Sequence, residues 1–379
     1  MNWKLLKKIT LFLTGWRVLL FMIGAFAPSV LQFQPSYPYF SSLLQPLGPE
    51  WLVKWAGFDG VHYLTIVQKG YLGTGLIQAF FPMYPILVRI LSWMMNPIVA
   101  GLLLSHLAFI GAMYVWTQIL ALLNKQIIWW QACLPFLLFP TALFFGAFYT
   151  ESLFLLFVLC CYYFMRKGQI FPAAVCAALA SATRVVGVAL VPMMLLYLLL
   201  SRTKNKISLL NLGIVLLGVC GLAAYMMYLQ QVFHDSIYFM HVQAEFGGGR
   251  QENLILLPQV LFRYLKIFIT PHTWTWSYYA YIQEVVLTLI FLATLTWLTV
   301  KQWKTYLAEL LYSWSVVLIP PLTGTLQSMP RYVIAAFPVF FIWMNLRVKH
   351  PKAFWSLCIA STVLLALNIL LFIQGYWVA

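Results

Sequence analysis

The stretch that decides the fold is residues 98–122, IVAGLLLSHLAFIGAMYVWTQILAL, which contains no aspartate, glutamate, lysine or arginine. A helix of about 20 apolar residues is long enough to cross the hydrocarbon core of a bilayer. Similar apolar stretches recur along the chain. Because only helices and closed barrels satisfy their backbone polar groups inside a bilayer, this pattern predicts an all-α polytopic membrane protein.

Working outward from this stretch, the hydropathy pattern predicts about 10–12 transmembrane helices in one integral-membrane domain, residues 1–379. An alternative for residues 170–200 is a pair of helices broken around Arg184. Residues 83–95 and 256–270 are candidates for short or half-crossing helices. The predicted spans are residues 9–29, 98–122, 127–146, 150–165, 170–200, 207–230, 278–300, 307–322, 332–346 and 353–373.

The first span imitates a signal peptide. Lys4, Lys7 and Lys8 precede its apolar run, and Ala25-Phe26-Ala27 resembles a cleavage site. Because Pro28 follows directly and hinders cleavage, and because the run is long enough to span, we predict an uncleaved anchor.

Composition excludes a soluble globular protein. Hydrophobic residues make up 63% of the chain and charged residues 8%, whereas a soluble domain carries about 25% charged residues. The formal net charge is +15. Because the cations lie in short clusters between apolar segments, they indicate cytoplasmic loops that face anionic lipid, and we expect membrane lipids but no nucleic acid as partners.

The cation clusters also predict the topology. Residues 31–82, 231–275 and 323–331 are then extracytoplasmic, and the first of these long loops should carry short interfacial helices. The topology between residues 82 and 150 stays open. The clusters assigned to the cytoplasm are Arg166-Lys167, then Arg202, Lys204 and Lys206, then Lys301 and Lys304, and finally Arg347, Lys349 and Lys352.

Asp59 is the first candidate for chemistry. It is one of only two aspartates in the chain and lies among aromatic residues just beyond the first span. A carboxylate in such a place is suited to accept a proton from an attacking hydroxyl group. His62, three residues later, would share its helical face. The alternative is that Asp59 caps a short helix starting at Gly60.

Tyr84 belongs to a second aromatic block, Ala79-Phe80-Phe81-Pro82-Met83-Tyr84-Pro85. The two prolines restrict the backbone where the chain re-enters the membrane. Aromatic rings there could stack on a sugar or a lipid chain. An interfacial aromatic belt explains the same composition.

Glu151, Arg184 and Arg331 are ionisable residues in or beside apolar stretches. Such residues are costly in a bilayer and usually face a cavity or a partner. The forked, permanently charged guanidinium of Arg184 or Arg331 could grip a phosphate, and a helix N-terminus after Pro330 would assist. The alternatives are a helix start at Glu151 capped by Thr150, and structural ion pairs of the arginines.

The second outer loop holds a further polar group, His234-Asp235-Ser236, then His241 to Gln243, then Gly247-Gly248-Gly249-Arg250. Gln243 and Arg250 could shape an acceptor site or a donor headgroup site. A solvated loop with a flexible glycine turn is the competing interpretation.

No cofactor or metal is indicated. The sequence has no phosphate-binding glycine loop, no HExxH, no Cys/His metal spacing and no DxD pair. The missing DxD pair argues against a metal-dependent nucleotide-sugar enzyme, although a divalent metal remains compatible with the chain. The six cysteines all lie in apolar runs and read as packing residues.

The motifs together resemble the PIG-V family of mannosyltransferases of the GPI-anchor pathway and their bacterial relatives. The resemblance covers most of the chain in order, and the blocks around Asp59 and from Phe80 to Pro85 are the more specific ones. The blocks are Phe58-Asp59-Gly60-Val61-His62-Tyr63-Leu64, Gly70-Tyr71, Phe80 to Pro85, Phe139-Pro140, Tyr149-Thr150-Glu151-Ser152, Arg184 with Gly187, Asp235 to Arg250, and Ser328 to Pro338.

This resemblance implies a GT-C fold, an active site on the non-cytoplasmic face, and an inverting transfer of a sugar, typically mannose, from a polyprenyl-phosphate donor. The acceptor would be a hydroxyl on a glycolipid, wall polymer or protein. Asp59 would be the base, Arg331 and Arg184 would hold the phosphate, and Tyr84 and Tyr332 would position sugar or phosphate. The family usually has Trp-Asp where this chain has Phe58-Asp59.

Two other functions compete with this one. A transporter or flippase of a lipid-linked or polar substrate would also use intramembrane charges and broken helices, but the sequence shows no internal repeat. A purely structural role in the membrane would not explain the few ionisable residues inside apolar stretches. Short loops favour a bacterial plasma membrane, with the endoplasmic reticulum as the location in a eukaryote.

Overall fold

The computed structural model describes residues 2–71, 76–123, 127–200, 209–247, 249–271 and 273–379. Helices and loops account for all of them, and the described residues contain no strand. The all-α prediction is therefore confirmed. The predicted cytoplasmic cluster Arg202, Lys204 and Lys206 lies outside the described residues, as does Gly248 of the glycine turn.

Five helical segments are long and apolar enough to cross a membrane, and a sixth is added if a bent pair counts as one span. The chain is therefore membrane-embedded. The total of about 10–12 transmembrane helices stays a prediction. The five segments are Trp3–Ser29 (α1 with η1), Pro97–Leu122 (α5), Leu209–Phe233 (α10, η8 and α11), Trp276–Thr323 (α14 with η10) and Pro351–Ile373 (α17).

The predicted span 127–146 is wrong as one continuous helix. Helix α6 covers only Trp129–Leu137, and a separate short helix, η6, covers Ala142–Phe145. Pro140 explains the break, because a proline disfavours helical geometry in the residue before it. The short segment after η6 leads into α7, whose first residue is the candidate Glu151.

The predicted break at Arg184 is confirmed. Helix α8, Ile170–Ser181, is followed by η7, Val185–Ala189, and then by α9, Leu190–Leu200. Arg184 itself is extended, with φ −152° and ψ 143°. The predicted span is thus a pair of short helices whose junction contains a cation.

Helix α14, Trp276–Leu318, joins the two predicted spans 278–300 and 307–322 in one run of 43 residues. Its backbone leaves helical geometry at Gln302 and Tyr306, where the loop was expected. A helix of this length reaches about 65 Å at 1.5 Å per residue, about twice the hydrocarbon thickness. The length and the kink fit two crossings.

The described residues between 31 and 82 form only short helices, as expected for a loop that does not cross the membrane. The longest is α3, Asp59–Lys69. The others are η2 (Phe40–Leu44), η3 (Gln45–Leu47), α2 (Glu50–Val53), η4 (Lys54–Ala56) and η5 (Ile77–Ala79).

The second long loop contains α12 (Tyr238–His241), η9 (Val242–Phe246) and α13 (Leu257–Ile269). The remaining helices are α4 (Met83–Leu91), α7 (Glu151–Arg166), α15 (Met329–Tyr332), η11 (Val333–Ala335) and α16 (Val339–Lys349).

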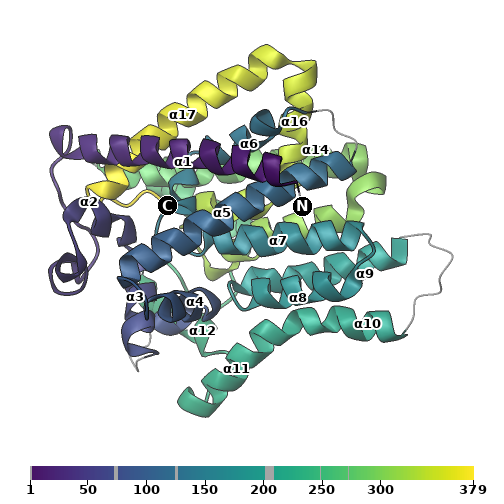
Figure 1. Cartoon of the computed structure of the whole chain (residues 1–379). Coiled ribbons are helices and arrows are strands. Elements are labelled where there is room, and N and C mark those ends of the chain that lie inside the picture. The colour runs from purple at the N-terminus through teal and green to yellow at the C-terminus, as the bar shows by residue number, and fades with distance from the viewer. Residues whose placement is uncertain (1, 72–75, 124–126, 201–208, 248, 272) are drawn as a thin grey trace. The chain divides into compact units, whose positions relative to one another are not determined.

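The chain divides into two compact units. Unit 1 comprises residues 1–70, 84–159 and 340–378, and unit 2 comprises residues 71–83, 160–339 and 379. In unit 1, α1 packs against both α5 and α17 (Figure 1). In unit 2, α8 packs against α10 and α11, and these teal helices lie side by side in Figure 1.

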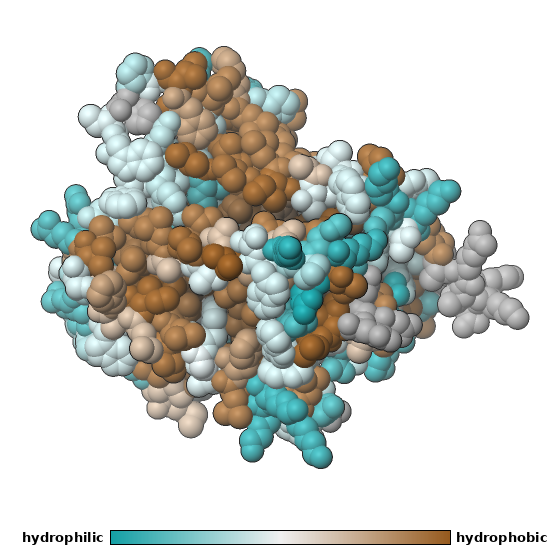
Figure 2. Space-filling view, turned by 90° about the horizontal axis from the view of Figure 1, so that it is seen from above, coloured by the Kyte–Doolittle hydropathy of each residue, from teal (hydrophilic) through white to brown (hydrophobic). Residues whose placement is uncertain are grey.

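Large apolar side chains are exposed along the helices, as a lipid-facing surface requires. Trp93 and Met94 are 82% and 86% exposed, and Leu11, Met22 and Val363 on two of the spans each exceed 60%. Figure 2 shows wide brown areas interrupted by separate teal groups on the visible face. In a water-soluble monomer, patches of this extent would be a liability.

One close contact in unit 1 gives a test of its packing. A methyl group added at Gly101 on α5 would overlap the ring of Phe148, whereas one added at Gly15 on α1 would meet nothing within 4 Å. We expect Gly101→Ala to destabilise the protein by about 1–3 kcal/mol, as overpacking does elsewhere. Thermal unfolding in detergent should show a lowered midpoint for Gly101→Ala only, and an equal midpoint for both variants would contradict this packing.

Candidate functional site

The nine predicted site residues fall into two groups. Unit 1 contains Asp59, His62, Tyr84 and Glu151, and unit 2 contains the other five. Each group is described within its own unit. The residues of the second group are Arg184, Gln243, Arg250, Arg331 and Tyr332.

Asp59 opens helix α3 from an unusual backbone. The preceding residue, Phe58, has φ 55° and ψ −120°, a region that residues with a side chain rarely adopt. The helix begins at Asp59 itself, so the alternative in which Asp59 caps a helix starting at Gly60 is wrong by one residue. A carboxylate in the first turn is favoured by the helix dipole, and Asp59 is partly buried there.

Aromatic packing holds Phe58 in this conformation. Its ring lies 4.6 Å from that of Tyr37, and 5.5 Å from those of both Phe372 and Trp377, centroid to centroid. Strained backbone persists only where surrounding contacts enforce it, and it concentrates at functional sites. Ser328, directly before α15, and His234, in the second outer loop, also have positive φ; of the four such non-glycine residues described, Phe58 alone directly precedes a predicted site residue.

Two hydrogen bonds fix the approach to Asp59 against the segment before α7. The backbone N–H of Phe148 donates to the carbonyl of Trp55 at 3.0 Å. The hydroxyl of Tyr149 donates to the carbonyl of Gly57 at 2.9 Å. Segments more than 90 residues apart in sequence are thereby joined, so Asp59 stands on a rigid support rather than on a free loop.

His62 lies one turn after Asp59 and interacts with it electrostatically. Burial lowers the pKa of His62 below 6.5, and the neighbouring Asp59 charge opposes part of that shift. Burial is the larger cause, so the imidazole is neutral at pH 7. A neutral imidazole can accept or donate a hydrogen bond near the carboxylate.

This pKa shift predicts a pH dependence of stability. The unfolded chain binds a proton at His62 below about pH 6.5 while the folded chain resists it, so the free energy of unfolding should fall as pH drops through that value. In the His62→Gln variant, the free energy of unfolding should fall less as the pH drops. In the control His350→Gln, which changes an exposed histidine, it should fall as much as in the wild type. Unfolding midpoints between pH 7.5 and 5 check this; identical curves for wild type and His62→Gln would refute it.

Tyr84 is completely buried beneath the same segment. Its hydroxyl donates to the carbonyl of Gly101 at 3.0 Å and lies 3.1 Å from Oγ of Ser105. Ser105 in turn donates to the carbonyl of Tyr149 at 3.2 Å. In unit 1, Tyr84 therefore supports the backbone around the site, and its direct contact with a sugar stays a prediction.

Glu151 is 3% exposed and is the first residue of α7, directly after Thr150. It interacts electrostatically with Tyr84. Tyr63, which the sequence reasoning did not select as a site residue, links the two regions: its ring is 5.6 Å from that of Tyr84, and its hydroxyl is 3.4 Å from Oγ1 of Thr150. Unit 1 thus contains two interacting pairs, Asp59 with His62 and Tyr84 with Glu151, and Tyr63 of α3 lies against the second pair's region.

In unit 2 the structure brings Arg184 to Tyr332. The guanidinium carbon lies 5.0 Å from the tyrosine ring centroid, a cation–π distance. Arg331 is 2% exposed. A helix begins beside Pro330, as expected, but α15 has only four residues, and assistance from its dipole to a phosphate stays a prediction.

The second outer loop forms a further cluster in unit 2. Nη1 of Arg250 donates to Oε1 of Gln243 at 2.8 Å, and the Arg250 guanidinium lies 5.0 Å from the ring centroid of Phe246. Nearby in sequence, His241 and Asp235 pair at 2.6 Å. The predicted pair Gln243 and Arg250 is therefore in direct contact.

Sequence reasoning missed three buried ionisable residues, Arg17, Glu284 and Glu309. Tyr264 donates to Glu284 at 2.6 Å, and Tyr162 donates to Glu309 at 2.7 Å. The available signal was an ionisable residue inside an apolar stretch, the same signal that selected Glu151. A hydropathy value averaged over many residues does not reveal single polar positions such as these.

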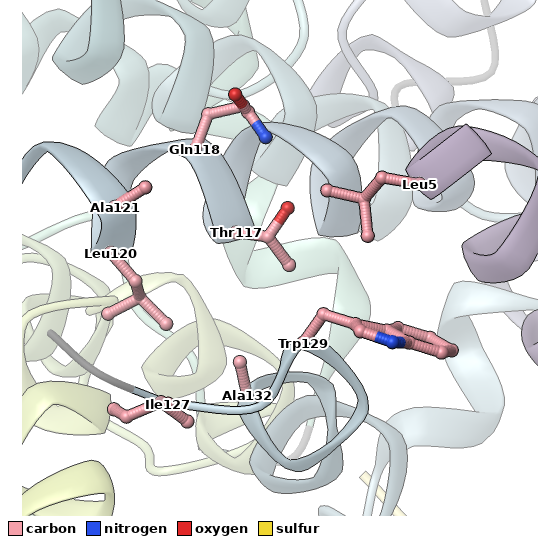
Figure 3. A pocket seen from close by; sticks show the side chains of 8 residues that line it. All are labelled: Leu5, Thr117, Gln118, Leu120, Ala121, Ile127, Trp129 and Ala132. Atoms are coloured by element: carbon pink, nitrogen blue, oxygen red, sulfur yellow. The ribbon is translucent and has the colours of Figure 1, made fainter. Parts of the chain in front are cut away.

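A small pocket lies elsewhere in unit 1, with a volume of about 180 Å³. Figure 3 shows its lining side chains, which come from the start of α1, the second half of α5 and the region around α6. None of the nine predicted site residues lines it. The lining residues are Leu5, Thr117, Gln118, Leu120, Ala121, Ile127, Trp129 and Ala132.

Within the described ranges, no group of three or more His, Cys, Asp or Glu side chains is placed to hold a metal ion. Four of the carboxylates pair instead with other side chains: Glu284 and Glu309 with tyrosines, Asp235 with a histidine and Glu50 with a lysine. Comparison of the chain with models of known protein families, with curated proteins and with solved structures finds no match.

Proposed function

We propose that this protein is a multi-pass membrane glycosyltransferase of GT-C type. It transfers a sugar, with mannose as the first candidate, from a polyprenyl-phosphate donor to an acceptor hydroxyl on the extracytoplasmic side. The observation that carries the proposal is Asp59, a partly buried carboxylate at the start of α3 behind the strained residue Phe58. A bacterial plasma membrane is the proposed location.

In the proposed reaction, Asp59 accepts the proton of the acceptor hydroxyl as its oxygen attacks the anomeric carbon. The bond between that carbon and the phosphate oxygen breaks, and the electron pair leaves with the lipid phosphate. Because this leaving group is a stable anion, the reaction depends less on a general acid than on positive charge around the phosphate. His62, which interacts electrostatically with Asp59, is proposed to orient the carboxylate.

Arg331 and Arg184 are proposed to supply that positive charge. A guanidinium presents two parallel N–H donors to two phosphate oxygens and stays charged at any physiological pH. The contact with the Tyr332 ring is proposed to orient the Arg184 guanidinium. Gln243 and Arg250 are proposed to bind the acceptor or the donor headgroup.

The donor class is tested with purified full-length protein in lipid nanodiscs. Polyprenyl-phosphate mannose, GDP-mannose and polyprenyl-phosphate glucose are each supplied with a panel of glycolipid and peptide acceptors, and product masses are measured. We expect product from a lipid-phosphate donor only. Product from the nucleotide sugar alone would reject the proposed donor class.

A transporter is the second candidate, because α8 and α9 form a broken pair with Arg184 at the junction, as in transporter binding sites. Reconstituted vesicles discriminate the two. Translocation of a fluorescent lipid-phosphate sugar across the vesicle membrane without any glycosylated product would favour this candidate over the enzyme.

A further inference from the structure

Helix α13 exposes an apolar strip that neither the packing of unit 2 nor the proposed reaction uses. Phe262, Leu265 and Ile269 follow one another along this helix, and each side chain is more than half exposed. Because residues three or four apart are neighbours on a helix surface, the three side chains form one continuous strip. Val260 and Tyr264, on the opposite side, are buried. The strip therefore faces away from the protein.

Helix α13 is too short to cross a membrane. Its 13 residues extend for about 20 Å at 1.5 Å per residue, whereas the hydrocarbon core is about 30 Å thick. A helix of this length either enters the bilayer part-way, as one of the expectations for residues 256–270 had it, or lies along the membrane surface. The segments at its two ends distinguish these arrangements.

Both ends of α13 adjoin residues suited to the membrane surface. Before it, Glu252 and Asn253 are exposed polar residues, and a carboxylate is costly inside hydrocarbon. After it, the exposed Trp274 has its ring 5.4 Å from that of Tyr278, and such rings favour the headgroup level. A helix that entered part-way would place its two ends at different depths. The flanking residues therefore favour an orientation along the surface.

The inner side of α13 is bonded to two loops next to proposed site residues. Nη1 of Arg263 donates to the carbonyls of Gly249 and Gly324, at 3.1 and 3.0 Å. A methyl group added at Gly324 would overlap the same nitrogen, so the contact is close. Gly249 directly precedes Arg250, and Gly324 lies in the loop before α15, which carries Arg331. The position of α13 thus constrains both loops.

We propose that α13 binds the membrane surface as an interfacial helix, parallel to the bilayer plane, with Phe262, Leu265 and Ile269 among the upper acyl chains of the phospholipids. By the predicted topology this is the extracytoplasmic leaflet. Removing the strip from water stabilises this orientation. A second part rests on the proposed function: through its inner side, α13 holds the loops of Arg250 and Arg331 at the depth of lipid phosphates.

The test measures the depth of nitroxide spin labels by EPR, from their accessibility to oxygen and to a water-soluble nickel complex. Phe262→Cys, Leu265→Cys and Ile269→Cys are each made in full-length protein with Cys220→Ala, which removes the exposed native thiol. The protein is studied in phosphatidylcholine–phosphatidylglycerol nanodiscs. We expect all three labels at one depth, about 5–10 Å below the headgroups.

The two arrangements give different depth profiles, because Phe262 and Ile269 lie about 10 Å apart along the helix axis. A part-way helix would separate the depths of these two labels by most of that distance, which would overturn the parallel orientation. Free access of the nickel complex to all three labels would overturn membrane binding. Val363→Cys is the deep reference, because Val363 is exposed near the middle of a membrane-spanning helix.

A label at Glu252→Cys tests the second part, since Glu252 is exposed beside Arg250. It should lie at headgroup level, shallower than the three labels of the strip. A Glu252→Cys label in bulk water, beyond the headgroups, would overturn the proposed depth of the loop and leave the orientation of α13 standing. Depth is read without substrate, so these results do not depend on whether sugar transfer occurs.

Discussion

Asp59→Asn is expected to reduce sugar transfer by about 10²–10⁴-fold, the range that removal of a general base typically costs. The amide keeps the size of the side chain and can still lie in the first turn of α3, but it cannot accept the proton of the attacking hydroxyl. Initial rates of product formation at saturating donor check this, with the insertion and thermal stability of the variant measured in parallel.

The matched control for this variant is Glu50→Gln. Glu50 lies in the same predicted outer loop and pairs with Lys54 at 2.8 Å, with its side chain 58% exposed. Glu50 has no role in the proposed reaction, so transfer per folded molecule should stay close to wild type; because Lys54 is buried, the thermal midpoint of Glu50→Gln is measured as well. If Asp59→Asn and Glu50→Gln behave alike, Asp59 is not the base.

Arg331→Lys is expected to reduce kcat by about 10²–10³-fold, comparable with the loss of one donor that stabilises a developing negative charge. Lysine keeps the positive charge but loses the forked pair of N–H donors. Because Arg331 is 2% exposed, retaining a cation also limits damage to the fold. The measurement is kcat and KM with the lipid-phosphate donor.

Lys266→Met serves as the control in the same unit, because Lys266 is an exposed cation on α13. It should leave both constants near wild type. A rise in KM for Arg331→Lys without a change in kcat would mean that Arg331 binds donor and transition state equally. Wild-type kinetics for Arg331→Lys would exclude a phosphate role.

Much of the fold was predictable because a bilayer limits the chain to helices. Apolar stretches such as 98–122 predicted α5 to within one residue, and the polar interruption at Arg184 predicted the break between α8 and α9. The error at 127–146 has a local cause that hydropathy does not register, since Pro140 ends a helix inside an apolar run. Helix boundaries therefore followed from backbone chemistry as much as from hydropathy.

The candidate site was predictable only in part. The spacing of Asp59 and His62 predicted that they would share a face of one helix, and the structure shows electrostatic interaction between them. The conformation of Phe58 was not predictable, because it depends on Phe372 and Trp377, more than 300 residues away in sequence. Long-range packing of this kind leaves no mark on the local sequence.

The most direct test of the central claim is a single-turnover reaction of the reconstituted protein with a polyprenyl-phosphate sugar, with the anomeric configuration of the product determined by NMR. We expect wild type to transfer the sugar with inversion and folded Asp59→Asn to form no detectable product in the same time. Retention of configuration, or transfer by Asp59→Asn at the wild-type rate, would contradict the claim that the Asp59 carboxylate drives a single displacement.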